Sequence, residues 1–466
     1  MSSQTSRAPE SDRLLPPQPV ASLDDHLAAG GGRGLARALE LGPEATLEVV
    51  EASGLRGRGG AGFPTARKWR GVSAAARDDG SALTLVVNAA EGEPGTFKDR
   101  TLLRSQPYAL LEGICTALAT TGATTAHIGI KAKFQREIER LTAALSEVRD
   151  AGWHGADRID LVLGPDAYLF GEESAMLEVL EGNLPLPRIV KPFDAGLGAT
   201  TSTANPTIVN NVETLSHVPA ILANGAEWFR QAGTEASPGT MVCTVVGDVG
   251  SPGVYEVALG TPLRTLLEDI AGATEIKAVY SGVSNAVITE AMLDLPLCFD
   301  AMRAAGTGLG SGGFVVYDHS RAIIDVLSVL VNFLAVESCG QCNACKLGNS
   351  AMAELLAKVQ RGEADQTDLE QLLRWSETVT DSNRCYLPVG SQLVVGSTVQ
   401  AFVEEVVATV DAGVPTPQDL PTPLLEDIDE DTGEVRYHER YHLKQLDWSY
   451  ADEDPGAVRL AAIRDR

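Results

Sequence analysis

The sequence predicts an α/β protein in three parts: a largely parallel sheet flanked by helices, a small β-grasp-like module, and a helical unit that carries most of the cysteines. Three observations lead to this prediction. Strand-like and helical segments alternate in the first half of the chain. A β-turn-β-helix-β order begins at Met241, and helical patterning dominates from Arg321 to about Asp411.

The composition excludes several classes of protein. The 466 residues carry 63 acidic and 37 basic side chains, a formal net charge of −26. The length allows two to four domains at roughly 150 residues each. The acidic excess excludes nucleic acid as a primary partner, because phosphate binding needs a cationic surface. No stretch approaches the roughly 20 apolar residues that span a bilayer. We therefore expect no direct membrane insertion and a cytoplasmic location, at most peripheral to the membrane through partner subunits.

The first part begins after a leader. Residues 1–22 are polar and rich in proline and serine, so we expect them to be disordered. An α/β domain is predicted over residues 23–239. Its strands are expected at 82–88, 127–130 and 159–163, and its helices at 108–120, 134–149 and 172–180. Such alternation is typical of a parallel sheet with crossover helices.

The remaining parts differ in character. The β-grasp-like domain is predicted over residues 240–318, with strands at 241–246, 254–257, 278–281 and 314–317 and a helix at 263–271. A helical domain is predicted over residues 319–412. Residues 413–466 form an acidic, proline-rich tail with a charge run at 426–431. We interpret this tail as a flexible arm or a partner-docking strap rather than a domain.

A glycine-rich segment, GLRGRGGAGFPT at residues 54–65, is a distinctive local motif. Glycines let backbone N–H groups crowd around an anion, because no Cβ blocks the approach and positive φ causes little strain. Arg56, Arg58 and Lys68 add cationic donors suited to phosphate. The alternative is a flexible surface loop, since the segment is neither a Walker motif nor a clean dinucleotide fingerprint.

Three further polar sets lie between residues 88 and 214. The first, NAAEGEPGTFKDR at 88–100, follows an apolar strand, where open α/β sheets place their ligands. Its alternative is a solvated turn. The second, GEES at 171–174, either binds a ligand or complements a helix dipole. The third, NNVET at 210–214, either binds a polar ligand or caps the next helix. With the glycine loop, these sets jointly favour a binding site.

The cysteines give the sharpest signal. Cys339, Cys342 and Cys345 form a C-x2-C-x2-C run, and Cys385 is a candidate fourth ligand. Closely spaced thiolates with a fourth from elsewhere are typical of a [4Fe–4S] cluster. Zinc is the alternative, although structural zinc usually takes two separated pairs of ligands.

Together these motifs resemble the NADH-binding, flavin-carrying subunit of respiratory complex I and the related diaphorase subunits of NAD-linked hydrogenases and formate dehydrogenases. The resemblance runs from about Leu23 to Phe402, through GLRGRGGAGFPT, N-x-x-EGEPGTFKDR, YLFGEESAMLEVLEG, PTIVNNVETL and ESCGQCNACKLG. It implies a Rossmann-like FMN-binding domain, a β-grasp domain of the soluble-ligand-binding type and a helical bundle that carries one [4Fe–4S] cluster.

The resemblance also implies roles for single residues. Glu93 would lie where hydride passes, Glu173 would face the adenosine ribose and favour NADH, and Phe63 and Phe193 would stack on adenine. The implied catalytic residues are Glu93 and Lys68. The implied cofactor-binding residues are Gly57, Arg58, Gly59, Gly60, Gly62, Phe63, Lys68, Asn88, Glu91, Glu93, Gly171, Glu172, Glu173, Phe193, Asn210, Asn211 and Thr214. The implied metal ligands are Cys339, Cys342, Cys345 and Cys385.

Four positions depart from the family pattern. Ala90 stands where the family usually has aspartate, Gly71 where it often has an aromatic residue, and Phe170 where it has cysteine. Lys191 lies one place later than in the usual motif. These differences indicate a divergent branch of the family.

The expected activity is that of an NADH dehydrogenase (diaphorase) subunit. Hydride would pass from NADH to FMN, and electrons would pass singly to the cluster and on to a partner iron–sulfur protein or quinone-reducing complex. We expect a companion subunit, since the chain lacks the thioredoxin-like and ferredoxin-like segments of some hydrogenase relatives. That companion would be a thioredoxin-like [2Fe–2S] subunit, a ferredoxin or a larger redox complex. The alternatives are a non-catalytic relay or scaffold subunit with degenerate NADH binding, an NADH:ferredoxin-type component outside complex I, and a zinc-stabilised ligand-binding protein.

Overall fold

The N-terminal part of the protein is built on a parallel sheet. The computed structural model describes residues 13–413, 417–430 and 432–451. The sheet has the strand order β3-β2-β1-β4, and every neighbouring pair is parallel. Its strands are β1 (Thr84–Ala89), β2 (Thr125–Lys131), β3 (Ile159–Gly164) and β4 (Thr207–Asn211). The three predicted strands are confirmed, and β4 is an additional strand whose last two residues were expected only as ligands or a cap.

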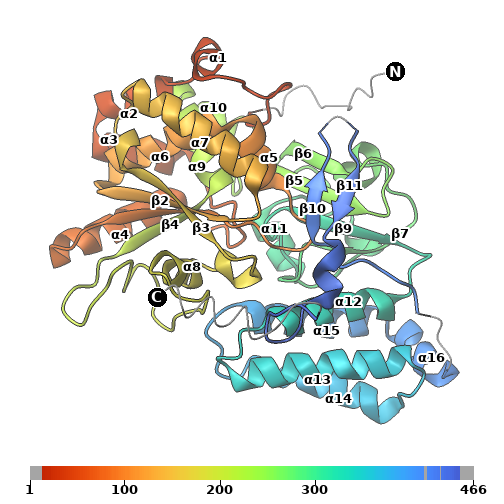
Figure 1. Ribbon diagram of the computed structural model, residues 1–466. Helices are drawn as coiled ribbons and strands as arrows, with labels where there is room; N and C mark the ends of the chain where they lie inside the picture. The colour runs from red at the N-terminus through yellow and green to blue at the C-terminus, as the bar shows by residue number, and fades with distance from the viewer. Residues whose placement is uncertain (1–12, 414–416, 431, 452–466) are drawn as a thin grey trace.

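Helices cover this sheet (Figure 1). They are α1 (Leu23–Ala28), α2 (Arg33–Leu41), α3 (Pro43–Ser53), α4 (Thr65–Asp79), α5 (Lys98–Ser105), α6 (Pro107–Thr121), α7 (Gln135–Asp150), α8 (Glu173–Leu180), α9 (Val212–Asn224) and α10 (Ala226–Arg230). Helix α6 is buried along almost its whole length, because its apolar sequence packs between the sheet and other helices. A Cβ built on Gly113 would lie 2.1 Å from the Leu215 carbonyl oxygen, so glycine permits α6 and α9 to cross closely.

The second part is a five-stranded mixed sheet in the order β6-β5-β9-β7-β8. Its strands are β5 (Thr240–Gly247), β6 (Gly253–Ala258), β7 (Ile276–Tyr280), β8 (Ile288–Thr289) and β9 (Gly313–Asp318). Strands β5 and β9 pair parallel, and the other neighbours pair antiparallel. The predicted helix at 263–271 is a π-helical turn, Thr265–Ile270, and a short helix α11 (Phe299–Ala304) follows. The mixed sheet agrees with the predicted β-grasp module.

The third part is a helical bundle, α12 (Ile323–Glu337), α13 (Asn343–Gln360), α14 (Gln366–Thr378), α15 (Leu387–Ala401) and α16 (Val403–Ala412). Figure 1 shows it as a separate group of blue-green helices below the mixed sheet. Among the described residues, no single helix is long and apolar enough to cross a membrane. Helices α15 and α16 pass that test only as a pair, with a bend of 82° between them.

The described part of the leader is ordered, which corrects the expectation of disorder for residues 13–22. Leu14 and Leu15 are buried in the core of the N-terminal part. The backbone N–H groups of Arg13, Leu14 and Leu15 all donate to one carboxylate oxygen of Glu256 on β6, at 2.8–2.9 Å. Two buried leucines and a carboxylate that accepts three N–H groups fix this segment despite its polar composition. Residues 1–12 lie outside the described part.

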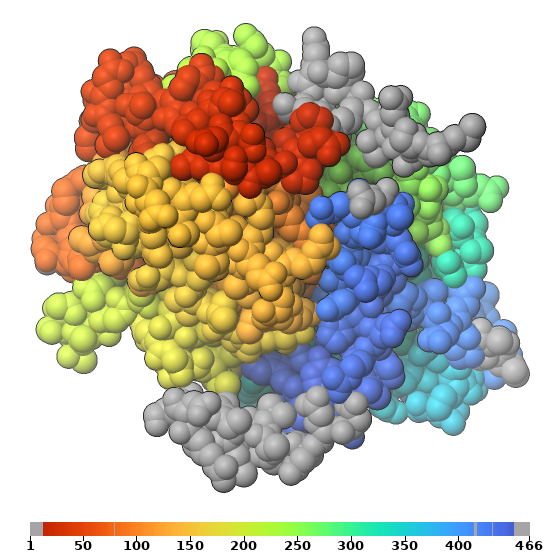
Figure 2. Space-filling model, turned by 45° about the horizontal axis from the view of Figure 1, so that its top comes forward, coloured from red at the N-terminus to blue at the C-terminus, as the bar shows by residue number. Residues whose placement is uncertain are grey.

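The tail is a packed strap rather than a flexible arm over its described residues. We call residues 417–430 and 432–451 the C-terminal strap. It contains a hairpin, β10 (Leu425–Ile428) with β11 (Val435–Tyr437), and a helical turn, Glu439–Leu443. Asp427 within the acidic run is buried and pairs with Arg104 at 2.8 Å. The sequence could not reveal this, because the buried arginine lies 323 positions away along the chain. Figure 2 shows the strap in blue beside the N-terminal part.

Candidate functional site

The glycine loop lies between α3 and α4 and is closed at its base by backbone hydrogen bonds. Gly57 N–H donates to the Phe63 carbonyl at 2.9 Å, and Thr65 N–H donates to the Leu55 carbonyl at 3.0 Å. Gly60 has φ of +128°, which side-chain-bearing residues rarely adopt. A Cβ there would meet only a Gly310 backbone atom at 4.0 Å. The tip is therefore held in a glycine-specific conformation beside open space.

Other glycines of the loop are required by close packing. A Cβ on Gly62, whose φ is +62°, would lie 2.5 Å from the Phe299 ring. A Cβ on Gly59 would lie 3.0 Å from the Asn211 Cβ at the end of β4. The loop is thus seated against both the parallel sheet and the β-grasp module.

The Arg58 side chain faces the interior, contrary to its expected place among the phosphate donors. It is fully buried, and its guanidinium donates to the carbonyls of Arg56, Pro238 and Thr240. Burial lowers its pKa to about 10, partly opposed by Glu213 at 3.9 Å. Its backbone N–H donates to Thr214 Oγ1 at 2.8 Å. Arg58 and Thr214 therefore hold the loop from behind.

Lys68 joins three elements beside the loop. Its ammonium donates to Glu173 Oε1 at 2.7 Å and to the Val209 carbonyl at 2.9 Å. These contacts connect α4 with the first residue of α8 and with β4. Phe63 and Phe193 are about half exposed. Lys68 and Glu173 are thus brought together, while both phenylalanine rings remain accessible from solvent.

The end of β1 approaches the turn before α8. Asn88 Nδ2 donates to the Gly171 carbonyl at 2.6 Å, and Asn88 Oδ1 accepts from Ala90 N–H at 3.2 Å. A Cβ on Gly171 would lie 3.3 Å from the Ala90 carbonyl oxygen, so the two backbones lie close together. The structure therefore brings Asn88 and Gly171 together at the carboxyl edge of the parallel sheet.

The two asparagines that end β4 are anchored to neighbouring helices. Asn210 Oδ1 accepts from the buried Trp69 indole at 2.8 Å. Asn211 caps α9 by accepting from Glu213 N–H at 3.0 Å, and its amide donates to Asp99 at 2.6 Å. The capping alternative thus applies to Asn211, which nonetheless lies beside Gly59 at the sheet edge.

Two of the predicted acidic residues accept hydrogen bonds from helix N-termini. Glu172 accepts from the N–H groups of Ser174 and Ala175 at the start of α8. Glu91 accepts from the N–H groups of Asp99 and Arg100 at the start of α5. Burial, and then the nearby Asp99 carboxylate, raise the pKa of Glu91 to about 7. Both acids thus stabilise helix starts next to the loop ends that would hold a ligand.

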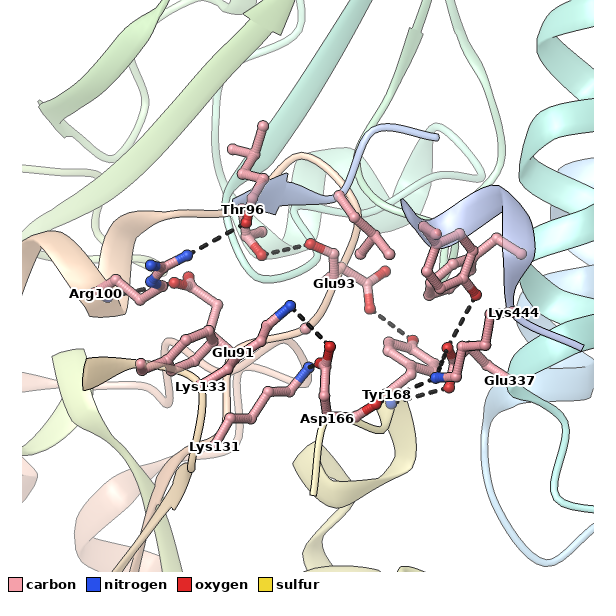
Figure 3. A pocket seen from close by; sticks show the side chains of 16 residues that line it. Glu91, Glu93, Thr96, Arg100, Lys131, Lys133, Asp166, Tyr168, Glu337 and Lys444 are labelled. Atoms are coloured by element: carbon pink, nitrogen blue, oxygen red, sulfur yellow. Dashed lines mark hydrogen bonds and ion pairs between the residues drawn. The ribbon is translucent and has the colours of Figure 1, made fainter. Parts of the chain in front are cut away.

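Glu93 occupies the junction of the parallel sheet with the β-grasp module (Figure 3). Its Oε2 accepts from the Tyr168 hydroxyl at 2.6 Å, and its Oε1 accepts from Val283 N–H at 2.8 Å and Ser284 Oγ at 2.9 Å. Burial raises the pKa of Glu93, which these three donors partly oppose. Tyr168 and Ser284 were not predicted. Tyr168 was detectable, since it begins the YLFGEES motif, whereas Ser284 joins the site only through the fold.

The four predicted cluster cysteines line one cavity in the bundle. Cys339, Cys342, Cys345 and Cys385 share it with apolar residues that include Leu169, Pro187 and Leu387. Burial raises the pKa of the Cys345 and Cys385 thiols to about 12. Within the described chain, no three His, Cys, Asp or Glu side chains converge on a point that holds a single metal ion.

Amide donors accompany these sulfurs. Gln341 Nε2 lies 3.7 Å from Cys339 Sγ, and Asn349 Nδ2 lies 3.6 Å from Cys345 Sγ. Hydrogen bonds to cluster sulfurs tune iron–sulfur potentials. Four thiols around an apolar hollow with amide donors fit a [4Fe–4S] cluster better than one zinc ion.

Comparison with known proteins matches three segments of the chain to known families. Residues 50–220 match the family described as Nuo51 FMN-binding domain, residues 242–285 the SLBB domain, and residues 325–409 the NADH-ubiquinone oxidoreductase-F iron-sulfur binding region. An F-type subunit of the NADH-quinone oxidoreductase of Rhizobium meliloti is 39% identical over 84% of this chain and 94% of its own length. This chain belongs to the family of NADH-quinone oxidoreductase F-type subunits. The predicted family, Rossmann-like fold class, FMN and [4Fe–4S] cofactors and NADH oxidoreductase activity are thereby confirmed.

Hydrogenase subunits are similar too. The NADP-reducing hydrogenase subunit HndC of Solidesulfovibrio fructosivorans is 35% identical over 84% of this chain and 81% of its own length. A crystal structure of an NAD+-reducing [NiFe]-hydrogenase in the H2-reduced state matches with a TM-score of 0.75 at 32% identity. That match covers 93% of this chain and 72% of the hydrogenase chain. The structure of the air-oxidised state matches with a TM-score of 0.72 at 35% identity, over 83% of this chain and 66% of that one. Relatives of this chain thus belong to multi-subunit complexes of more than one kind.

The residues at the sheet edge fit FMN as well. The open glycine tip offers backbone N–H groups without side-chain obstruction, and Lys68 supplies a cation beside it. Polar groups of Asn88, Glu91 and Asn210 lie at the carboxyl edge of the same strands. This set of donors and acceptors is suited to the phosphate and ring edges of a flavin.

Proposed function

We propose that this protein binds NADH against FMN at the carboxyl edge of the parallel sheet and passes electrons to the cysteine cavity. One placement carries this proposal. The glycine loop packs on Asn211 at the end of β4, Lys68 donates to Val209 of the same strand, and Glu93 follows the neighbouring strand β1. Bound FMN supplies the chemistry that accepts two electrons with hydride and releases them singly, as a [4Fe–4S] cluster requires. The chain's own residues bind, orient and shield the reactants.

In this arrangement each side chain has a distinct task. Phe63 and Phe193, both accessible, stack on the adenine ring. Glu173 accepts from the adenosine ribose hydroxyls, and its carboxylate repels a 2′-phosphate. Glu93 accepts three hydrogen bonds that fix its carboxylate, and it orients the nicotinamide end of the substrate. Arg58 does not contact the ligand. It fixes the glycine loop through its buried hydrogen bonds to backbone carbonyls.

Electron release requires a partner that reaches the cluster. A groove beside the cysteine cavity is lined by Ile189, Cys342, Cys385 and Tyr386. Ile189 and Tyr386 are 71% and 55% exposed, so the groove presents two large apolar side chains to solvent. We place the companion iron–sulfur subunit on this groove in a cytoplasmic complex. Hydroxyl-radical footprinting of the co-purified complex tests this placement. We expect the groove residues to be protected from oxidation in the complex.

The decisive experiment is anaerobic addition of NADH to purified protein reconstituted with FMN, iron and sulfide. We expect flavin absorbance to bleach and the cluster to be reduced in the same sample. If dithionite reduces the cluster while NADH leaves the flavin oxidised, the protein is a relay or scaffold subunit and the proposal fails. Zinc in place of iron in protein purified from its native host would also contradict it.

A further inference from the structure

The C-terminal strap contacts the loop that carries Glu93. Gly95 N–H, two residues after Glu93, donates to the Pro423 carbonyl at 2.6 Å. The buried Arg100 guanidinium donates to the carbonyls of Leu425 and Glu426 at 3.2 and 3.0 Å. Gly95 lies on the loop and Arg100 on α5, and in both of these contacts the strap supplies backbone carbonyls.

The strap also contacts the turn that carries Tyr168, through one buried carboxylate (Figure 3). Lys444 Nζ lies 2.6 Å from Glu337 Oε1, and the Tyr441 hydroxyl donates to the same oxygen at 2.9 Å. The other oxygen of Glu337 accepts from Tyr168 N–H at 3.0 Å. Glu337 thus connects the strap directly to the backbone of Tyr168, whose hydroxyl donates to Glu93.

Aromatic packing reinforces this connection. The Phe333 ring on α12 lies 5.2 Å from the Tyr168 ring and 5.6 Å from the Tyr441 ring, centroid to centroid. Lys444 Nζ also donates to the Asp166 carbonyl at 3.2 Å, two residues before Tyr168. The turn is held by the strap on two sides.

We propose that Tyr441 and Lys444 of the C-terminal strap are positioning residues that hold Tyr168 against Glu93 for the NADH reaction. This rests on the proposed function. The strap lies beyond residue 409, where the matched iron–sulfur region ends. Lys444 is the only cation that forms an ion pair with Glu337 among the described residues. Without it, a nearly fully buried carboxylate would retain only neutral donors, and the contact with Tyr168 would weaken.

The test compares Lys444→Met, Lys444→Arg and Tyr441→Phe in the full-length holoprotein. We expect hydrogen exchange of the peptide containing the Tyr168 amide to accelerate about tenfold in Lys444→Met, because losing one partner of a buried charge favours local opening. We expect kcat for NADH oxidation to fall about threefold or more, with FMN and iron content unchanged. Lys444→Arg should keep the exchange rate and kcat near the wild-type values. Tyr441→Phe should change both in the same direction as Lys444→Met, but by a smaller factor.

Lys277→Met is the matched control. Lys277 on β7 is also buried and pairs with Glu405 on α16 at 2.7 Å, which joins the β-grasp module to the bundle. It should lower thermal stability without changing exchange at Tyr168. Unchanged exchange in Lys444→Met, an equal change in Lys277→Met, or faster exchange with an unaltered kcat would each overturn the proposal. A wild-type protein that does not oxidise NADH would instead contradict the proposed function, and the exchange result would still decide whether the strap holds Tyr168.

Discussion

At the scale of single residues, buried carboxylates make several of the long-range contacts. Glu112 accepts from the His26 ring and from the N–H groups of Gly32 and Leu35. Glu256 accepts hydrogen bonds from the leader, and Glu337 accepts them from the strap. Each carboxylate accepts several hydrogen bonds, which offset its loss of hydration. Segments far apart in sequence are thereby fixed by one side chain.

Glu256 gives a prediction for pH dependence. Burial raises its pKa from 4.5 to about 7 in the folded protein. Because the folded state then binds the proton more tightly, the stability from protonation is present below about pH 4.5 and is lost as pH rises through about 7. In the wild type, the free energy of unfolding should therefore fall as the pH rises. Glu256→Gln should remove on the order of 3 kcal/mol of this pH-dependent fall, measured by urea unfolding between pH 5 and 8. Identical pH profiles of the variant and the wild type would contradict this.

Glu173 gives a prediction for coenzyme choice. Its side chain is 45% exposed and pairs with Lys68. Glu173→Gln removes the repulsion of a 2′-phosphate and frees the lysine, so we expect kcat/KM for NADPH relative to NADH to rise about tenfold. Steady-state kinetics with both coenzymes measure this ratio. Glu181→Gln, which removes a charge at the other end of α8, should leave the ratio unchanged.

At the scale of elements, close helix crossings depend on glycine. Helices α6 and α9 contact each other along their length, and Gly113 is where a Cβ would meet the backbone of the partner helix. A backbone carbonyl cannot rotate away as a side chain can. The N-terminal part therefore depends on this position more than on the many surface glycines.

Gly71 and Gly113, both within helices, allow a matched comparison. Gly113→Ala should destabilise the protein by about 1–3 kcal/mol or more, because α6 and α9 must move apart. Gly71→Ala on α4 meets nothing within 4 Å, so it should stabilise by about 0.5–1 kcal/mol through higher helix propensity. Chemical denaturation of both variants measures the difference. Equal effects would refute the packing argument.

At the scale of the whole molecule, side-chain contacts join the N-terminal part to the β-grasp module and to the helical bundle. Glu93 connects the N-terminal part to the β-grasp module through Val283 and Ser284. Leu169, which follows Tyr168 in the same helical turn, Tyr168–Gly171, lines the cysteine cavity. The candidate flavin edge and the cluster cavity are therefore neighbours across this turn, which suits electron transfer between them.

The flavin edge and the cysteine cavity lie in different parts of the protein, so we predict that the two cofactors can be lost separately. Cys385→Ala should lower iron and sulfide content strongly while FMN is retained, because Cys385 joins the cavity from between α14 and α15 and lies outside the flavin edge. Metal analysis and flavin absorbance of the same sample measure both. Cys298→Ala, which lies in the β-grasp module, should change neither. Loss of FMN together with iron in Cys385→Ala would show that the sites fold as one.

The α/β class, most strands of both sheets, the cysteine set and the family could be predicted from the sequence, because they follow from local periodicity and short motifs. The inward-facing Arg58 side chain and the packing of the leader and tail could not. Those outcomes depend on the tertiary fold, since Arg58, Glu256 and Arg104 find partners that are remote in the chain. A local pattern specifies an element, but only the assembled fold determines which buried charge meets which partner.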